Sequence, residues 1–187
     1  MKNKPIFYDT DCLACFLIID ECSVLFKMFS KVIIPEPVFD EFFIESTPKN
    51  IKNNLNLLIN SGFVEVKEIS ILSKEYSNYR CIEKGYWGGK SLGKGEASVI
   101  ALAIENNGMV ASNNISDVKK LTDEFNLSLL TTAIILGKSV EKNIITQDKA
   151  EMLWKKMLNR NRHLPDSSFH DYYSKRYKND CKNFLKY

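Results

Sequence analysis

The chain has 187 residues, of which 44% are hydrophobic and 26% charged, a balance typical of a folded globular domain and not of a disordered chain. Its formal net charge is +3, and no apolar run approaches the ~20 residues that a membrane-spanning helix needs. The amino terminus lacks the long apolar stretch of a secretory signal, so we expect a cytoplasmic protein with no membrane partner.

The first half of the chain alternates short apolar, β-branched runs with helical patterns. Periodicity and the placement of proline and glycine predict three strands, at residues 5–9, 31–35 and 63–66. Between them the apolar spacing predicts four helices, at residues 10–19, 23–29, 36–45 and 51–60.

The second half continues the alternation. Helices are predicted at residues 73–83, 95–106, 116–125, 131–140 and 148–159, and strands at residues 109–112 and 127–130. Strands separated by helices predict an α/β fold with a parallel sheet covered on both faces. We expect one domain over residues 1–160, followed by a basic, aromatic extension at 161–187 packed on or beside it.

The cysteines number five and are irregularly spaced, which does not indicate a disulfide framework. Cys12 and Cys15 form a C-x-x-C, which leaves a redox pair or half of a zinc site as alternatives. No second such pair supplies the remaining zinc ligands. The spacing of both cysteines with Phe16 and Ile19 matches one face of a buried helix, so simple burial is the interpretation we favour.

Acidic residues recur where predicted strands end or helices begin. Asp9 ends the first strand and Asp117 follows a later one, although each could equally serve as a helix cap or first-turn acid. Glu96 lies on the apolar face of a helix, where burial removes its hydration unless a cation or basic group compensates. Glu41 and its neighbour Asp40 follow the second strand, and periodicity does not choose between them. Convergence of these acids would require a hard divalent cation such as Mg²⁺ or Mn²⁺.

The segment Gly-Tyr-Trp-Gly-Gly-Lys-Ser at residues 85–91 resembles a phosphate-binding loop. The established pattern has its first glycine five positions before the Gly-Lys-Ser, and Lys84 stands there instead. No predicted strand leads into the segment, so we expect a mobile glycine loop and not a nucleotide site.

Four segments form a series along residues 5–140: I-F-Y-D-T-D at 6–11, V-I-I-P-E-P-V-F-D-E-F at 32–42, G-K-G-E-A-S-V-I-A-L-A at 93–103 and V-A-S-N-N-I-S-D-V at 110–118. Together they resemble the PIN-domain ribonucleases, particularly the toxins of prokaryotic toxin–antitoxin pairs. The resemblance implies a three-layer α/β/α fold with a central parallel sheet, followed here by a helical, basic C-terminal extension.

The same resemblance implies roles for individual residues. It selects Glu41 over Asp40 and gives one catalytic acid per segment: Asp9, Glu41, Glu96 and Asp117. Of these, Asp9, Glu96 and Asp117 are the implied ligands of Mg²⁺ or Mn²⁺. The implied supporting residues are Thr10, Ser112 and Asn114.

The function implied by the resemblance is metal-dependent endonucleolytic hydrolysis of single-stranded RNA by the toxin of a toxin–antitoxin pair. The implied partners are RNA, an antitoxin protein and a second copy of the chain. The alternative is a PIN-fold RNA-binding or assembly module of weak activity, and the presence of all four acids favours the enzyme.

The last part of the chain, residues 153–187, holds nine Lys/Arg against three Asp/Glu and many aromatic residues. We expect part of this basic surface to guide RNA toward the acids, with an exposed ring stacking on a base. The alternative is that the aromatic residues pack the tail on the domain while the cations stay solvated. The residues predicted to contact RNA are Lys155, Lys156, Arg160 and Arg162.

Overall fold

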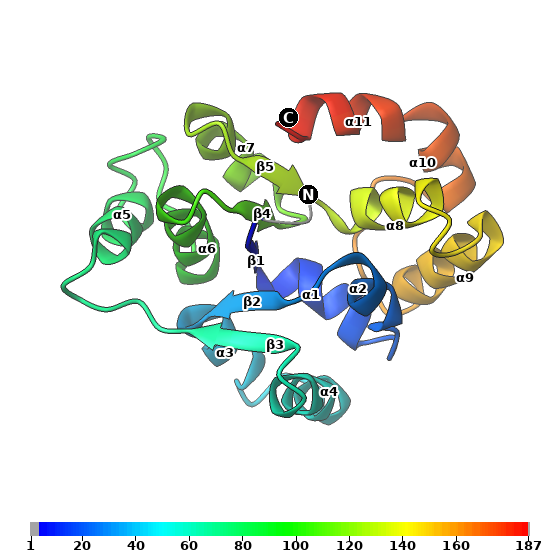
Figure 1. Cartoon of the computed structure of the whole chain (residues 1–187), viewed down its shortest axis with the longest axis horizontal. Helices are drawn as coiled ribbons and strands as arrows, with labels where there is room; N and C mark the ends of the chain where they lie inside the picture. The colour runs from blue at the N-terminus through cyan, green and yellow to red at the C-terminus, as the bar shows by residue number, and fades with distance from the viewer. Residues whose placement is uncertain (1–3, 187) are drawn as a thin grey trace.

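Five parallel strands form the central sheet of the computed structural model, which describes residues 4–186 (Figure 1). Their order across the sheet is β3-β2-β1-β4-β5, and Phe7 in the central strand is paired with Ile33 on one side and Val110 on the other. The strands are β1 Ile6–Tyr8, β2 Val32–Pro35, β3 Val64–Lys67, β4 Met109–Ala111 and β5 Ser128–Leu130. The predicted parallel sheet is therefore confirmed.

Helices cover both faces of this sheet. The first seven are α1 Thr10–Leu17, α2 Ser23–Met28, α3 Glu36–Phe42, α4 Lys49–Asn60, α5 Lys74–Glu83, α6 Lys94–Glu105 and α7 Ile115–Glu124. The chain moves outward through β2 to β3 and then returns past β1 to β4 and β5. Right-handed crossovers therefore place α1–α4 on one face and α5–α7 on the other, which gives the three expected layers. In particular, α6 packs on β1, β2 and β4.

The remaining helices continue the chain beyond β5. They are α8 Thr132–Glu141, α9 Gln147–Leu158, α10 Phe169–Lys175 and α11 Tyr177–Phe184. α10 packs on α8 and α9, and α11 packs on α8 and β5, so the C-terminal extension is helical and lies against the domain (Figure 1). None of the helices formed by residues 4–186 is both long enough and apolar enough to cross a membrane.

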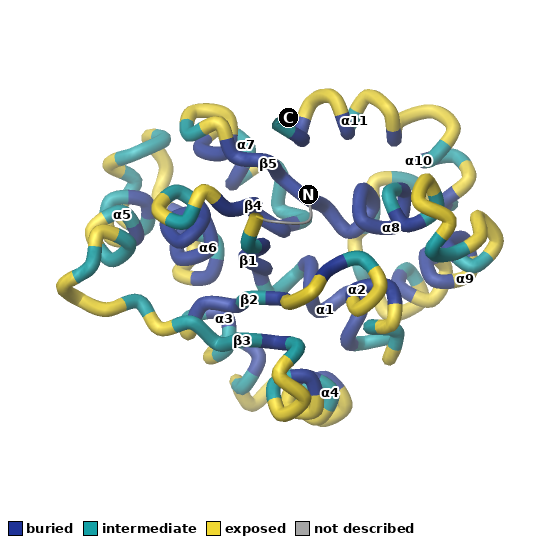
Figure 2. Tube along the Cα trace, in the orientation of Figure 1, coloured by how far each residue is buried: buried dark blue, intermediate teal, exposed yellow. Residues whose placement is uncertain are grey.

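Aromatic residues attach this extension to the domain. Trp154, Phe169 and Tyr172 are fully buried, and the rings of Trp154 and Tyr172 stack with centroids 5.4 Å apart. Tyr173 is only partly buried, but it stacks on Phe169 and Tyr177 within the same cluster. Figure 2 shows the inner sides of α9–α11 as buried and their outer sides as exposed. The tail aromatics therefore extend the hydrophobic core, and the expectation of a free ring for base stacking is not met by this cluster.

The two cysteines of the C-x-x-C are also part of the core. Cys12 and Cys15 are fully buried in α1 together with Phe16, and both are free thiols. Their predicted burial is confirmed, and desolvation raises the pKa of the Cys15 thiol to about 11.

Candidate active site

Asp9 lies at the carboxyl end of β1, where its backbone N–H still donates to the carbonyl of Ala111 at 2.8 Å. Its side chain is only 4% exposed and accepts a 2.8 Å hydrogen bond from the hydroxyl of Ser112. Although Asp9 is the residue before α1, its carboxylate makes no capping hydrogen bond to the helix. The capping alternative therefore does not explain this buried acid, because its side chain points to the end of the neighbouring strand β4.

Asn114 connects the next two acids. Its Nδ2 donates to Glu96 Oε1 at 3.1 Å and to Asp117 Oδ2 at 2.8 Å. Its backbone N–H donates to Ser112 Oγ at 3.1 Å, the same oxygen that donates to Asp9. Asp117 lies in the first turn of α7 and Glu96 in the first turn of α6. Ser112 and Asn114 thus join three carboxylates, from three different elements, into one hydrogen-bonded group.

Glu41 is held by a separate pair of donors. The hydroxyl of Thr10 donates to Glu41 Oε2, and the backbone N–H of Gly95 donates to Oε1 at 3.2 Å. A Cβ on Gly95 would lie 2.8 Å from Oε1, so a glycine is what allows this carboxylate to approach α6. Glu41 is partly buried whereas Asp40 is exposed, so the structure settles which of the two neighbours faces the other acids.

The electrostatics of the group are uneven. Burial is the main cause that raises the pKa of Asp9 from 3.8 to about 7, and the negative charges of Glu96 and Glu41 add to the rise. The hydrogen bond from Ser112 acts in the opposite direction. The pKa of Asp117 is lowered, chiefly by a hydrogen bond from Lys90 and then by Asn114. One end of the group thus has a cation beside it, and the other holds a buried acid whose negative charge is not offset.

The side-chain donors that this group offers to a metal ion are oxygens of carboxylates, a hydroxyl and an amide. Within residues 4–186, no three His, Cys, Asp or Glu side chains are already arranged to hold an ion. The donors are nevertheless all hard oxygens, which suit Mg²⁺ or Mn²⁺, and the raised pKa of Asp9 marks negative charge that a cation would stabilise. The chemistry of the residues therefore fits a hard divalent cation.

Three of the four basic residues predicted to contact RNA line two adjoining hollows, Lys155 and Lys156 the first and Lys156 and Arg160 the second. Lys155 Nζ lies 3.3 Å from Glu151 Oε1 on its own helix. Lys156 and Arg160 line a hollow beside Ile18, at the end of α1 remote from Asp9. Arg162 Nη1 lies 3.6 Å from Oδ1 of Asp11, an acid outside the group of four. Contact of these four residues with RNA stays a prediction.

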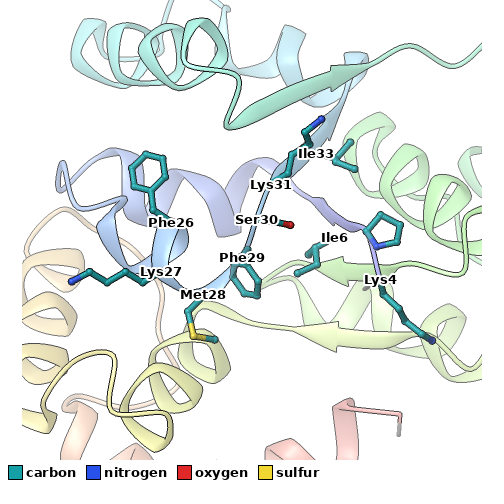
Figure 3. Close-up of a pocket in the computed structure, with 10 residues that line it drawn as sticks. Lys4, Ile6, Phe26, Lys27, Met28, Phe29, Ser30, Lys31 and Ile33 are labelled. Carbon is teal, nitrogen blue, oxygen red and sulfur yellow. The ribbon is translucent and has the colours of Figure 1, made fainter. Parts of the chain in front are cut away.

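A larger cavity, of about 660 Å³, lies at the opposite edge of the sheet. Residues at the beginnings of β1 and β2 and on α2 line it, among them Lys4, Ile6, Phe26 and Lys31 (Figure 3). None of the four acids contributes to this cavity. The acids occupy the carboxyl edge instead, where functional groups gather in open parallel sheets.

Sequence reasoning missed two residues at the acids. Lys90 forms an ion pair with Asp117, a contact that the glycine pattern of its own segment does not predict. Gly95 supplies the backbone donor to Glu41. The glycine-rich composition around Lys90 was the available signal, but nothing local indicates which distant helix such a loop contacts.

Comparison with known proteins gave two kinds of match. A family model described as a PIN domain matches residues 5–176. A solved structure, of VapBC2 from Rickettsia felis bound to a DNA fragment from their promoter, is similar with 20% identity and a TM-score of 0.50, covering 67% of this chain and 97% of that one. VapBC-1 from nontypeable Haemophilus influenzae aligns with 12% identity and a TM-score of 0.49, covering 68% and 97%. A search of curated proteins gave no match.

Proposed function

The chain belongs to the PIN-domain family of nucleases, and we propose that it is a divalent-metal-dependent endoribonuclease that cleaves single-stranded RNA. The observation that carries the proposal is the hydrogen-bonded series from Asp9 through Ser112 and Asn114 to Glu96 and Asp117. Neutral donors that join these acids hold the carboxylates close together, which is what a site for a divalent cation needs.

The proposed ligands are Asp9, Glu96 and Asp117. A divalent cation bound there would lower the pKa of a water molecule and offset negative charge on the reacting phosphate. Ser112 would fix the orientation of the Asp9 carboxylate, and the Asn114 amide would hold the other two. Glu41, held by Thr10 and the Gly95 N–H, would complete the acidic group beside the phosphate.

The biological setting that we propose is that of a toxin with an antitoxin protein as its partner. The support is the family membership together with the fold likeness to VapBC2, which covers nearly the whole of that chain. The proposed substrate, RNA, follows from the resemblance of the four acidic segments to PIN-domain toxins. A second copy of the chain is a further proposed partner.

A cleavage assay on an unstructured RNA oligonucleotide tests the proposal. We expect cleavage with Mg²⁺ or Mn²⁺ and none with EDTA. Glu41→Gln should reduce the rate by about 10- to 100-fold, whereas Asp40→Asn, which changes the exposed neighbour, should match the wild type. Binding of RNA without cleavage under any metal would favour the non-catalytic module instead, and equal rates for both variants would remove Glu41 from the site.

A further inference from the structure

The segment of residues 84–91 between α5 and α6 forms a closed loop. Gly85 has a φ of +76°, and a Cβ there would lie 2.8 Å from the backbone nitrogen of Ser91 and 2.9 Å from the carbonyl carbon of Lys90. The two ends of the loop therefore touch, and only a glycine fits both the conformation and the contact. This closure fixes the backbone of Lys90.

The loop is also attached to α7. The Trp87 ring packs on Phe125 with centroids 5.2 Å apart, and Lys120 Nζ donates to the carbonyl of Gly88 at 2.7 Å. A Cβ on Gly88 would lie 3.2 Å from Leu121, which shows how closely the backbone approaches the helix. The expectation of a mobile glycine loop is therefore not supported, because the loop has ring, backbone and hydrogen-bond contacts to one helix.

These contacts bring Lys90 to the acidic group. Its Nζ pairs with Oδ1 of Asp117, the acid in the first turn of that same helix, while 66% of the Lys90 side chain remains exposed. An exposed ion pair stabilises a protein by only about 0–1 kcal/mol. The pair alone therefore does not account for a loop closed and anchored around this lysine, and its open side faces solvent beside the acids.

We propose that Lys90 is a phosphate-binding residue for the RNA strand. Its ammonium contacts a backbone phosphate next to the acids, and it leaves Asp117 when a divalent cation binds that carboxylate. The anchored backbone sets where the contact is made, and the flexible four-carbon stem allows the exchange of partners. A group of carboxylates repels RNA, so a cation at its rim lowers the cost of bringing a phosphate there. This role rests on the proposed function of the site.

Lys90→Gln, Lys90→Arg and the control Lys84→Gln test the role. Lys84 is an exposed lysine just before the loop closes, so its variant removes the same charge from the same segment. Binding of a single-stranded RNA oligonucleotide is measured against salt, in EDTA and in Ca²⁺, with gels to follow any cleavage. Thermal melting shows that each variant is folded, and calorimetry gives the affinity for Mn²⁺ alone.

We expect Lys90→Gln to bind RNA about fivefold more weakly than the wild type in Ca²⁺, with a salt slope shallower by about 0.7. In EDTA its loss of RNA affinity should be smaller. Lys90→Arg should stay near the wild type and Lys84→Gln should be unchanged. The Mn²⁺ affinity of Lys90→Gln should be equal or higher, because the competing ammonium is gone. Unchanged RNA binding by folded Lys90→Gln, or an equal loss in Lys84→Gln, would overturn the role.

The outcome separates this role from the proposed function. A wild type that cleaves RNA while Lys90→Gln binds it normally removes the role of Lys90 and leaves the nuclease in place. If the wild type binds RNA through Lys90 but cleaves none with any metal, the role of Lys90 stands and the proposed nuclease activity is wrong. No RNA binding by the wild type overturns both.

Discussion

The hydroxyl of Ser112 donates a 2.8 Å hydrogen bond to Oδ2 of Asp9, and it joins the carboxyl ends of the neighbouring strands β4 and β1. The same oxygen accepts the backbone N–H of Asn114, whose amide then reaches Glu96 and Asp117. A fully buried serine thus orients an acid that is itself buried. The geometry of the whole acidic group therefore depends on a residue that carries no charge.

Ser112→Ala tests this dependence. Removing the hydroxyl takes away the donor that favours the ionised form of Asp9, so Mn²⁺ affinity measured by calorimetry should fall by about tenfold. The free energy of unfolding should fall by about 1 kcal/mol. Ser139→Ala is the matched control, because Ser139 is equally buried but donates to the carbonyl of Leu136 in α8. The same loss of Mn²⁺ affinity in both variants would contradict a specific role for Ser112.

Asp9→Asn should change how stability depends on pH in the absence of metal. The pKa of Asp9 is raised from 3.8 to about 7, so between these values the folded chain holds a proton that the unfolded chain has lost. Its contribution to stability therefore falls as pH rises through that window. In EDTA at pH 8, we expect the variant to be more stable than the wild type by on the order of 2 kcal/mol, and near pH 4 to be similar.

Chemical denaturation at several pH values measures this difference. Asp40→Asn, which alters an exposed acid on α3, serves as the control for removing one negative charge. If the difference in free energy of unfolding between Asp9→Asn and wild type stays constant from pH 4 to pH 8, Asp9 does not have the raised pKa described above.

Gly95→Ala should disturb Glu41 without disrupting the helix. The added methyl would lie 2.8 Å from Glu41 Oε1, and alanine is otherwise favoured over glycine inside a helix. We expect the far-ultraviolet circular dichroism spectrum to be unchanged and RNA cleavage to fall by about tenfold. Lys94→Ala, at the adjacent exposed position of α6, should cleave at the wild-type rate. Full activity in Gly95→Ala would mean that the position of Glu41 is not important.

The C-terminal extension should contribute to the stability of the whole fold. Phe169→Ala removes a fully buried ring that packs on Trp154 with centroids 5.7 Å apart, so we expect a loss of about 3 kcal/mol in one cooperative transition. Met152→Ala changes a residue on the exposed side of α9 and should lower the free energy of unfolding by less than about 1 kcal/mol. A separate early transition for the extension in Phe169→Ala would show that it folds independently.

The sequence predicted the sheet and the order of helices because short β-branched runs and helical apolar spacing are local signals. It also indicated acids at strand ends and helix starts, as with Asp9 and Glu96. Periodicity could not separate Glu41 from Asp40, because that choice depends on Thr10 and Gly95, which come from other elements. Lys90 was missed for the same reason, since its position follows from contacts between its loop and α7.

For the basic tail, composition indicates the charge and the aromatic content but not the contacts that each residue makes. The structure pairs Lys155 with Glu151 and Arg162 with Asp11, contacts that composition does not reveal. The buried rings of the extension account for its aromatic content through packing. The RNA contacts predicted for its basic residues stay a prediction.

If the four acids work as one metal-dependent centre, RNA cleavage should depend on the concentration of the metal ion and on each carboxylate. Initial rates are measured against Mn²⁺ concentration for wild type, Glu96→Gln and the control Glu105→Gln, which changes an exposed acid at the other end of α6. We expect saturable, EDTA-sensitive cleavage by wild type and Glu105→Gln, and a loss of at least about 100-fold in Glu96→Gln. Cleavage by folded Glu96→Gln at the wild-type rate, or cleavage that persists in EDTA, would contradict this expectation.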